Sequence, residues 1–215
     1  MYVPAHFATD DADALIARLA RRWAGVLITI GDDGAPVGTH MPILWDVEKR
    51  IATGHIARAN PQWKHGVGQG LIVLSGPEAY VTPSWYPSKA EHGKAVPTWN
   101  YEAVHITGRV EWIDGGERLE AIVRDLSSFF ERERPAPWAM EDAPRGYIGA
   151  LLRGIVGVEL RAERIESKRK LSQNKSAADF NGVAAGLIGS ADPLAQEVAA
   201  LMHAERPMAD DPEGN

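Results

Sequence analysis

The stretch VLITIGDDGAPVGTHMPILW, residues 26–45, decides the fold class of this chain. Its first five residues are β-branched or leucine, and VGTHMPILW (37–45) forms a second extended segment. Between them, Asp32, Asp33 and Gly34 have the composition of a tight turn. Extended segments that are joined by a short turn pair antiparallel, so we expect a hairpin here.

More strand-like segments follow the hairpin, and most of them are joined by turns or loops. They are IATGHI (51–56), LIVLS (71–75), AYVTPSWY (79–86), NYEAVHITGRVEWI (100–113) and IVGVELRAERIE (155–166). Successive parallel strands would need crossover helices, so this order argues against a doubly wound sheet. We therefore expect a mainly β fold with helices, of the α+β class, built on an antiparallel β-barrel.

Helices are expected around this barrel. Residues 10–24 have helical apolar spacing with acids in the first turn and arginines in the last, and Gly25 follows as a terminator. The other expected helices cover residues 115–133, 145–152 and 176–187, with a last one from Pro193 capped by Asp192. We expect one domain over 1–187, a helix packed on or beside it over 188–206, and a flexible tail over 207–215.

The composition argues against several classes of protein. The chain has 215 residues, of which 45% are hydrophobic and 24% charged, as in an ordinary soluble domain. It has no cysteine and its seven histidines lack ligand-like spacing, so no metal site is expected. A net charge of -6 disfavours the broad grip of non-specific nucleic-acid binders. Because no apolar run is long enough for a bilayer, we expect no membrane association and a cytoplasmic location.

The segment GHIARANPQW, residues 54–63, concentrates hydrogen-bonding groups at a strand exit. A phosphate is best held by an arginine fork, side-chain hydroxyl or amide donors and backbone N–H groups. The side chains that could serve are Thr53, His55, Arg58 and Asn60. The alternative is that His55 and Asn60 cap the turn that Pro61 enforces while Arg58 is solvated.

A second segment, residues 83–105, is rich in aromatic residues on both sides of a polar loop at 87–97. Trp85, Tyr86, Trp99 and Tyr101 have flat apolar faces and polar tips, which suit the walls of a pocket for a planar ring. The loop then acts as a lid. The alternative is that these aromatic residues belong to the core of the barrel.

The one basic cluster in this acidic chain is RAERIESKRKLSQNK, residues 161–175. It suits a phosphate-bearing ligand or a nucleic-acid backbone, although a run of charges is most often a solvated face. Ser172, Gln173 and Asn174 follow a strand and precede a helix, a position where side-chain donors often hold a ligand.

Five motifs together resemble the PaiB family of FMN-binding negative transcriptional regulators. They are MYVPAHF (1–7), GHIARANPQW (54–63), GPEAYVTPSWY (76–86), VPTWNYEAVHITG (96–108) and KLSQN (170–174). The resemblance runs from Met1 to about residue 187. It implies an antiparallel FMN-binding split β-barrel with peripheral helices, which works as a homodimer with the flavin at the subunit interface. Ala5 and Arg169 depart from the family pattern.

The resemblance also implies a set of cofactor-binding residues, with no metal ligand and no assigned catalytic residue. They are His55, Arg58, Asn60, Trp85, Trp99, Asn100, Tyr101, Lys170, Ser172, Gln173 and Asn174. Thr39, His40 and Thr53 complete the set of residues that we expect to bind the cofactor.

Three functions are compatible with these observations. The first is a regulator, although the chain has no recognisable DNA-binding motif and would have to read DNA through residues 161–175. The second is an FMN-dependent oxidoreductase, a flavin reductase or an oxidase-like enzyme, which admits a small-molecule substrate beneath the loop at 87–97. In that case His92 and His105 are candidate proton donors. The third is a barrel that has lost flavin and binds another ligand in the same groove.

Overall fold

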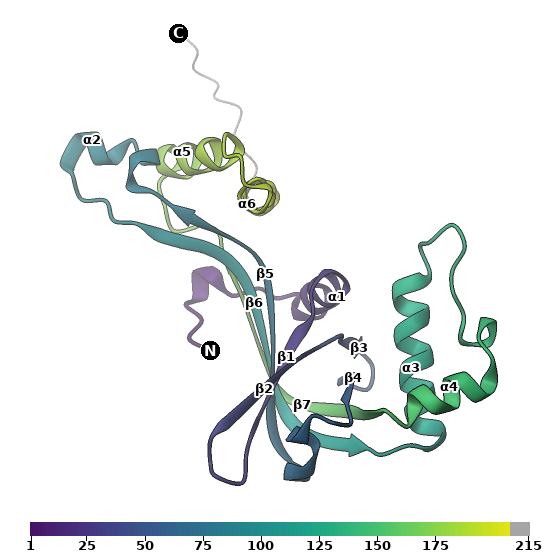
Figure 1. Cartoon of the computed structure of the whole chain (residues 1–215). Helices are drawn as coiled ribbons and strands as arrows, with labels where there is room; N and C mark the ends of the chain where they lie inside the picture. Colours follow the sequence, from purple (N-terminus) through teal and green to yellow (C-terminus); the bar gives the residue numbers. More distant parts are fainter. Residues whose placement is uncertain (207–215) are drawn as a thin grey trace. The chain divides into compact units, whose positions relative to one another are not determined.

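A computed structural model of the chain describes residues 1–206; the flexible tail expected over residues 207–215 lies outside this range. The fold is of the α+β class, with one antiparallel sheet of seven strands in the order β2-β1-β5-β6-β7-β4-β3 (Figure 1). The strands are β1 (Gly25–Ile30), β2 (Pro36–Met41), β3 (Leu44–Asp46), β4 (Ile51–Ala57), β5 (Gly68–Val81), β6 (Thr98–Ile113) and β7 (Ile155–Lys170).

Six α-helices and four short 3-10 helices complete the described chain. The α-helices are α1 (Ala12–Arg22), α2 (Ser88–His92), α3 (Gly116–Glu131), α4 (Arg145–Leu152), α5 (Ala177–Ile188) and α6 (Pro193–Glu205). The 3-10 helices are η1 (Ala5–Phe7), η2 (Pro61–His65), η3 (Pro83–Trp85) and η4 (Met140–Asp142). Within residues 1–206, no helix combines the length and apolar character of a transmembrane span.

The chain divides into two compact units. Within the described residues, unit 1 contains residues 1–10, 75–103 and 167–206, and unit 2 contains residues 11–74 and 104–166. Helices α5 and α6 belong to unit 1, whereas α1, α3 and α4 belong to unit 2. The single domain expected over residues 1–187 and the separate helix expected over 188–206 stay predictions.

The hairpin that the sequence predicts over residues 26–45 is present, with one refinement. Strands β1 and β2 pair antiparallel from Gly25 opposite Met41 to Ile30 opposite Pro36. The second extended segment is divided after Met41, and its last part becomes β3, which pairs with β4 instead of β1. Pro42 stands at the division, where a residue without an N–H cannot continue the ladder.

A buried glutamine links strands that are far apart in the order of the sheet. Gln62 lies on η2, directly after β4, and its side chain is fully buried. Its Nε2 donates to the carbonyl oxygens of Leu27 (3.2 Å) and Val37 (3.0 Å) and to the Thr29 hydroxyl (3.0 Å). These acceptors lie on β1 and β2, which are far from β4 in the sheet order. The sheet of unit 2 therefore curls upon itself, as a barrel requires.

Side chains fill the interior of this barrel. Leu27, Ile72, Ile106, Val158 and Leu160 are fully buried in one cluster of unit 2. Interiors packed in this way have few voids larger than a water molecule. A flat ligand must therefore lie outside the barrel wall.

Two local predictions are wrong. The strands expected at 71–75 and 79–86 are one strand, β5, which continues through Pro77 and ends at Val81. Only residues 70–73 of β5 pair with β1, so Pro77 lies beyond that ladder and its missing N–H removes no bond there. Gly25 does not end the first helix, because α1 stops at Arg22 and Gly25 begins β1.

The requirement for glycine at position 25 has another cause. A Cβ atom built on Gly25 would lie 2.8 Å from Cγ1 of Ile43. The residue therefore permits close packing inside unit 2.

The other expected helices are confirmed: α4 spans Arg145–Leu152, and Asp192 caps α6 by accepting from the backbone N–H of Leu194. The loop at 87–97 contains the short helix α2.

Candidate functional site

The residues predicted to bind a cofactor fall into two groups, one in each unit. We call the group in unit 2 the β4 group; it consists of Thr39, His40, Thr53, His55, Arg58 and Asn60. We call the group in unit 1 the KLSQN group; it consists of Trp85, Trp99, Asn100, Tyr101, Lys170, Ser172, Gln173 and Asn174. Each group is described by itself.

Asn60 of the β4 group holds the turn after β4. Its Nδ2 donates to the Thr39 hydroxyl (2.8 Å), and its Oδ1 accepts from the backbone N–H of Gln62 (3.0 Å). The second bond makes Asn60 the N-cap of η2, with Pro61 at the first helical position. The capping role that the sequence left open for Asn60 is therefore confirmed.

Arg58 is tied to the chain around β7. Its Nε donates to the carbonyl of Arg153 (2.7 Å), and its Nη2 donates to the carbonyl of Ile155 (3.0 Å). The same Nη2 lies 2.6 Å from Oδ1 of Asp114, and the side chain is 33% exposed. The alternative of a solvated Arg58 is therefore wrong. These contacts use Nε and Nη2, so Nη1 remains to meet a ligand.

Thr53 and His55 lie on the face of β4 that points away from the barrel core. Ala52, Gly54 and Ile56 are buried, whereas Thr53 and His55 between them are half-buried, as strand alternation dictates. The Nδ1 atom of His55 is buried and has no hydrogen-bond partner among the described residues. Burial also lowers the pKa of His55, so its imidazole is neutral near pH 7. His40, on β2, is exposed.

The depressed pKa of His55 predicts an acid-sensitive unit 2. The unfolded state takes up a proton near the ordinary pKa of 6.5, whereas the folded state does so only at lower pH. The stabilisation that neutral His55 contributes to the folded state is therefore fully present above pH 6.5. It is lost as pH falls below 6.5, by at most about 1.4 kcal/mol per pH unit. Urea denaturation at pH 7.5 and at pH 5.5, ~2 units lower, measures the free energy of unfolding at each pH. Its decrease between the two should be smaller for His55→Gln than for the unmodified chain. Equal losses would contradict this assignment.

Two buried side chains fix the loop of the KLSQN group. Asn100 on β6 is fully buried; its Nδ2 donates to the Ser172 hydroxyl (3.0 Å), which in turn donates to Oδ1 of Asn100 (3.1 Å). Ser172 has a φ of 65°, a left-handed conformation that is uncommon for a residue other than glycine. Asn100 and Ser172 therefore define the local backbone.

Gln173 and Lys170 hold the same loop from its other side. Gln173 accepts from the backbone N–H of Leu171 (2.8 Å) and donates to the carbonyl of Arg169 (2.6 Å). The Nζ of Lys170 donates to the Thr98 hydroxyl (2.5 Å) and to the carbonyl of Trp99. Burial and the charges of two other lysines lower the pKa of Lys170.

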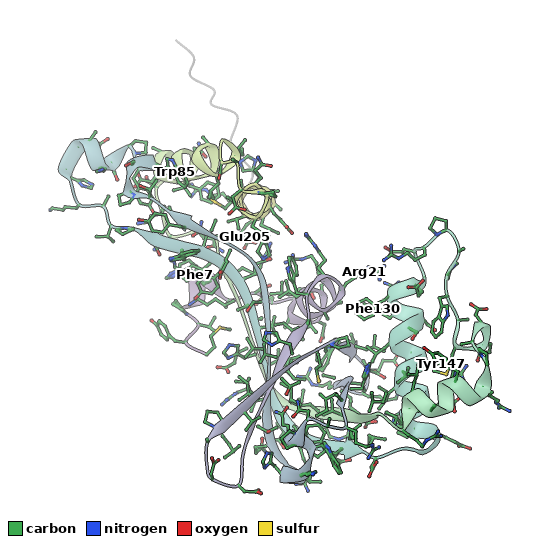
Figure 2. All side chains as sticks on the ribbon, viewed as in Figure 1. Phe7, Arg21, Trp85, Phe130, Tyr147 and Glu205 are labelled. Carbon is green, nitrogen blue, oxygen red and sulfur yellow. The ribbon has the colours of Figure 1, made fainter. Side chains whose placement is uncertain are left out.

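The aromatic members of the KLSQN group have different surroundings. Trp85 packs on α5 (Figure 2), where a Cβ added to Gly186 would lie 2.3 Å from its ring. Trp85 is half-buried and packs against the core cluster of unit 1, so the alternative of a place in the core of the barrel is wrong for this residue. Trp99 is half-exposed and makes an edge-to-face contact with Tyr80, with ring centroids 5.9 Å apart. The ring of Tyr101 lies 5.3 Å from Nζ of Lys168.

The basic run at residues 161–175 contains several paired or buried cations. Arg169 lies 2.8 Å from Oε1 of the buried Glu102 and 2.5 Å from Oε2 of Glu205. Lys168 is buried and donates to the carbonyl of Tyr2 (3.3 Å). This part of the run is therefore not a solvated charged face.

Four members of the KLSQN group line one pocket of about 210 Å³ in unit 1: Asn100, Lys170, Ser172 and Asn174. Lys175 lines it as well, although the sequence analysis did not select it. Its position directly after KLSQN within the basic run was a signal that could have found it. The described residues contain no group of three or more His, Asp or Glu side chains that could hold a metal ion.

The fold defines the class of protein: an antiparallel split β-barrel with peripheral helices, as expected from the sequence. The chain is similar in fold to the conserved hypothetical protein Rv2991 from Mycobacterium tuberculosis (TM-score 0.53, 17% identity, 81% of this chain and 92% of that one covered). It is also similar to the flavocytochrome Anf3 from Azotobacter vinelandii (TM-score 0.54, 14% identity, 78% and 72% covered).

Residues 1–164 match the family described as "Putative FMN-binding domain", and the chain belongs to this family. It is 31% identical over 206 residues to the protease synthase and sporulation protein PAI 2 of Bacillus subtilis, covering 94% of this chain and 96% of that protein. An uncharacterised protein of Aspergillus fumigatus is 37% identical over 175 residues, covering 66% and 67%. The resemblance to the PaiB family is thus confirmed.

Proposed function

We propose that this protein binds FMN through the β4 group and works as a homodimer in a PaiB-like regulatory role. The observation that carries the proposal is the family match over residues 1–164, which includes all six members of the β4 group. When bound, FMN supplies redox chemistry at its ring system. The chain's own residues bind and orient it.

The β4 group fits a flavin that carries a phosphate. Nη1 of Arg58 provides a cationic donor, because the contacts of this side chain use Nε and Nη2. His55 is half-buried on the outward face of β4, where its ring can border a bound flavin. The KLSQN residues stay predicted cofactor contacts.

The filled interior of the barrel supports the proposed homodimer. A flat cofactor on the outer wall stays in contact with water unless a second surface covers it, and a second copy of the chain supplies such a surface. Exposed aromatic residues suit an interface, and Trp99 and Tyr80 are both about half-exposed in unit 1. Sedimentation velocity with and without FMN tests the proposal, with an expected mass twice the 23.4 kDa of one chain.

The phosphate contact predicts a difference between FMN and riboflavin. Arg58→Ala should weaken FMN binding by about 1–3 kcal/mol, because a charge-assisted hydrogen bond to the phosphate is lost. Riboflavin has no phosphate, so its affinity should stay within about twofold. Quenching of flavin fluorescence measures both affinities.

The riboflavin arm separates a phosphate contact from structural damage, since Arg58 also bonds the carbonyls of Arg153 and Ile155. Damage to the fold would weaken both ligands equally. Arg109→Ala removes an exposed arginine from β6 of the same unit and serves as the matched control. If Arg58→Ala left the affinity for FMN unchanged, the phosphate would have to bind elsewhere.

A second candidate function is an FMN-dependent oxidoreductase acting on a small molecule, with an indirect regulatory effect. The observation that favours it is that two cations of the basic run at residues 161–175 are already engaged within the chain. Arg169 is paired with Glu102 and Glu205, and Lys168 is buried. The charges of these two side chains are therefore not free to meet a DNA backbone. Bleaching of bound flavin by NAD(P)H would favour the enzyme, whereas salt-sensitive retention of DNA with sequence preference would favour direct regulation.

A further inference from the structure

The pocket of unit 1 combines positive charge with hydrogen-bond donors. Its volume is about 210 Å³, and none of its described lining residues is acidic. The polar residues that line it are Thr98, Asn100, Lys170, Ser172, Asn174 and Lys175. In a chain with a net charge of -6, a concave site that is lined by two lysines and no carboxylate calls for a counter-charge from a ligand.

Neither lysine meets a carboxylate in the lining of the pocket, although Asp179, outside the lining, interacts electrostatically with Lys175. Lys170 donates to two neutral acceptors, the Thr98 hydroxyl and the Trp99 carbonyl, so the third N–H of its ammonium remains for a ligand. The Nζ of Lys175 lies 4.8 Å from the centre of the Tyr86 ring. Lys168 and Lys175 are the charges that act on Lys170, and both are positive. An anion between such groups would relieve their repulsion.

The loop that carries Asn174 and Lys175 is held in place before any ligand arrives. The Asn100–Ser172 pair, the left-handed backbone of Ser172 and the two bonds of Gln173 fix its course. Strained backbone that the surroundings hold in place is typical of ligand sites. Preorganised donors also lower the entropy cost of binding.

We propose that this pocket binds a compact anionic group, a phosphate or a carboxylate, of a small molecule. A volume of about 210 Å³ is enough for a phosphate or a short organic acid. Phe7, Val96 and Pro97 supply an apolar wall beside the charged side. The inference concerns unit 1 alone and does not require that the chain bind FMN.

Calorimetric titration of the full chain with inorganic phosphate, and separately with acetate, tests the inference. We expect saturable binding with one site per chain for phosphate. Lys175→Met and Asn174→Asp should each weaken phosphate binding by about tenfold or more. Lys175→Met removes a cationic donor, and Asn174→Asp adds a negative charge that repels the anion. Lys89→Met removes an exposed lysine from α2 of the same unit and should leave the affinity within about twofold.

Lys170→Met is informative only with a folding check, because Lys170 also bonds the Thr98 hydroxyl and the Trp99 carbonyl. Lys175→Met and Asn174→Asp leave those bonds in place, so the inference remains testable if Lys170→Met fails to fold. Absence of saturable binding for both anions, or equal affinities for the Asn174→Asp, Lys175→Met and Lys89→Met variants, would overturn the proposal.

The source of the anionic group is decided by repeating the titration on flavin-loaded protein. If phosphate binds equally well with FMN present, the ligand is a separate small anion. If FMN abolishes phosphate binding while riboflavin does not, the pocket takes the phosphate of the cofactor itself. Both outcomes support an anion site in unit 1. Failure of the FMN proposal would leave the phosphate titration of the flavin-free chain unaffected.

Discussion

Gln62→Ala is expected to lower the free energy of unfolding by about 3 kcal/mol, although the residue is polar and lies in a short 3-10 helix. The Gln62 side chain is fully buried and donates to the carbonyls of Leu27 and Val37 and to the Thr29 hydroxyl. Alanine leaves these buried acceptors without the amide and opens a cavity in its place. Urea denaturation followed by tryptophan fluorescence measures the change.

Two further variants isolate the role of the amide donor. Gln69→Ala removes an exposed glutamine of the same unit, whose Nε2 donates to Oε2 of Glu163 (3.0 Å), and should change stability by less than about 0.5 kcal/mol. Gln62→Glu keeps the shape but replaces the donor with a carboxylate that faces carbonyl oxygens. It should therefore destabilise at least as much as alanine does. If Gln62→Ala behaved like Gln69→Ala, the amide could not be what joins η2 to β1 and β2.

The fold could be predicted from the sequence where the determinants are local. The hairpin over residues 26–45 depends on two extended runs and a short turn. The N-cap Asp192 accepts a hydrogen bond from the backbone N–H of Leu194, only two residues further along the chain. The division at Pro42 was overlooked although proline marks it. The closure by Gln62 was beyond a local pattern, because its acceptors lie 25–35 residues away.

The sequence could predict which residue types belong to the candidate site, but not the hydrogen-bond partners of those residues. Arg58 was selected as a phosphate donor, yet two of its nitrogens are used by carbonyls that lie 95 and 97 residues away in the chain. No pattern within ten residues of Arg58 contains that information. The pocket of unit 1 shows the same limit, since it brings Asn100 together with Ser172, 72 residues away.

Gly182→Ala should destabilise unit 1 by about 3 kcal/mol, even though alanine has the higher helix propensity by about 1 kcal/mol. A Cβ atom on Gly182 of α5 would lie 2.1 Å from the carbonyl oxygen of Trp85 and 3.1 Å from Cδ of Pro87. The first contact is with backbone, so η3 would have to move as a whole. Thermal and urea denaturation of the variant measure the loss.

Gly189→Ala, at the C-cap of the same helix, is the matched control for this prediction. Its added Cβ would come no closer than 3.5 Å, to the carbonyl of Ala185, and its φ of -73° suits any residue. We expect a change below about 0.5 kcal/mol. Equal stabilities for Gly182→Ala and Gly189→Ala would mean that η3 does not rest on α5. The large predicted difference instead reflects a close backbone contact that keeps Trp85 packed against the core of unit 1, with its ring against Gly186.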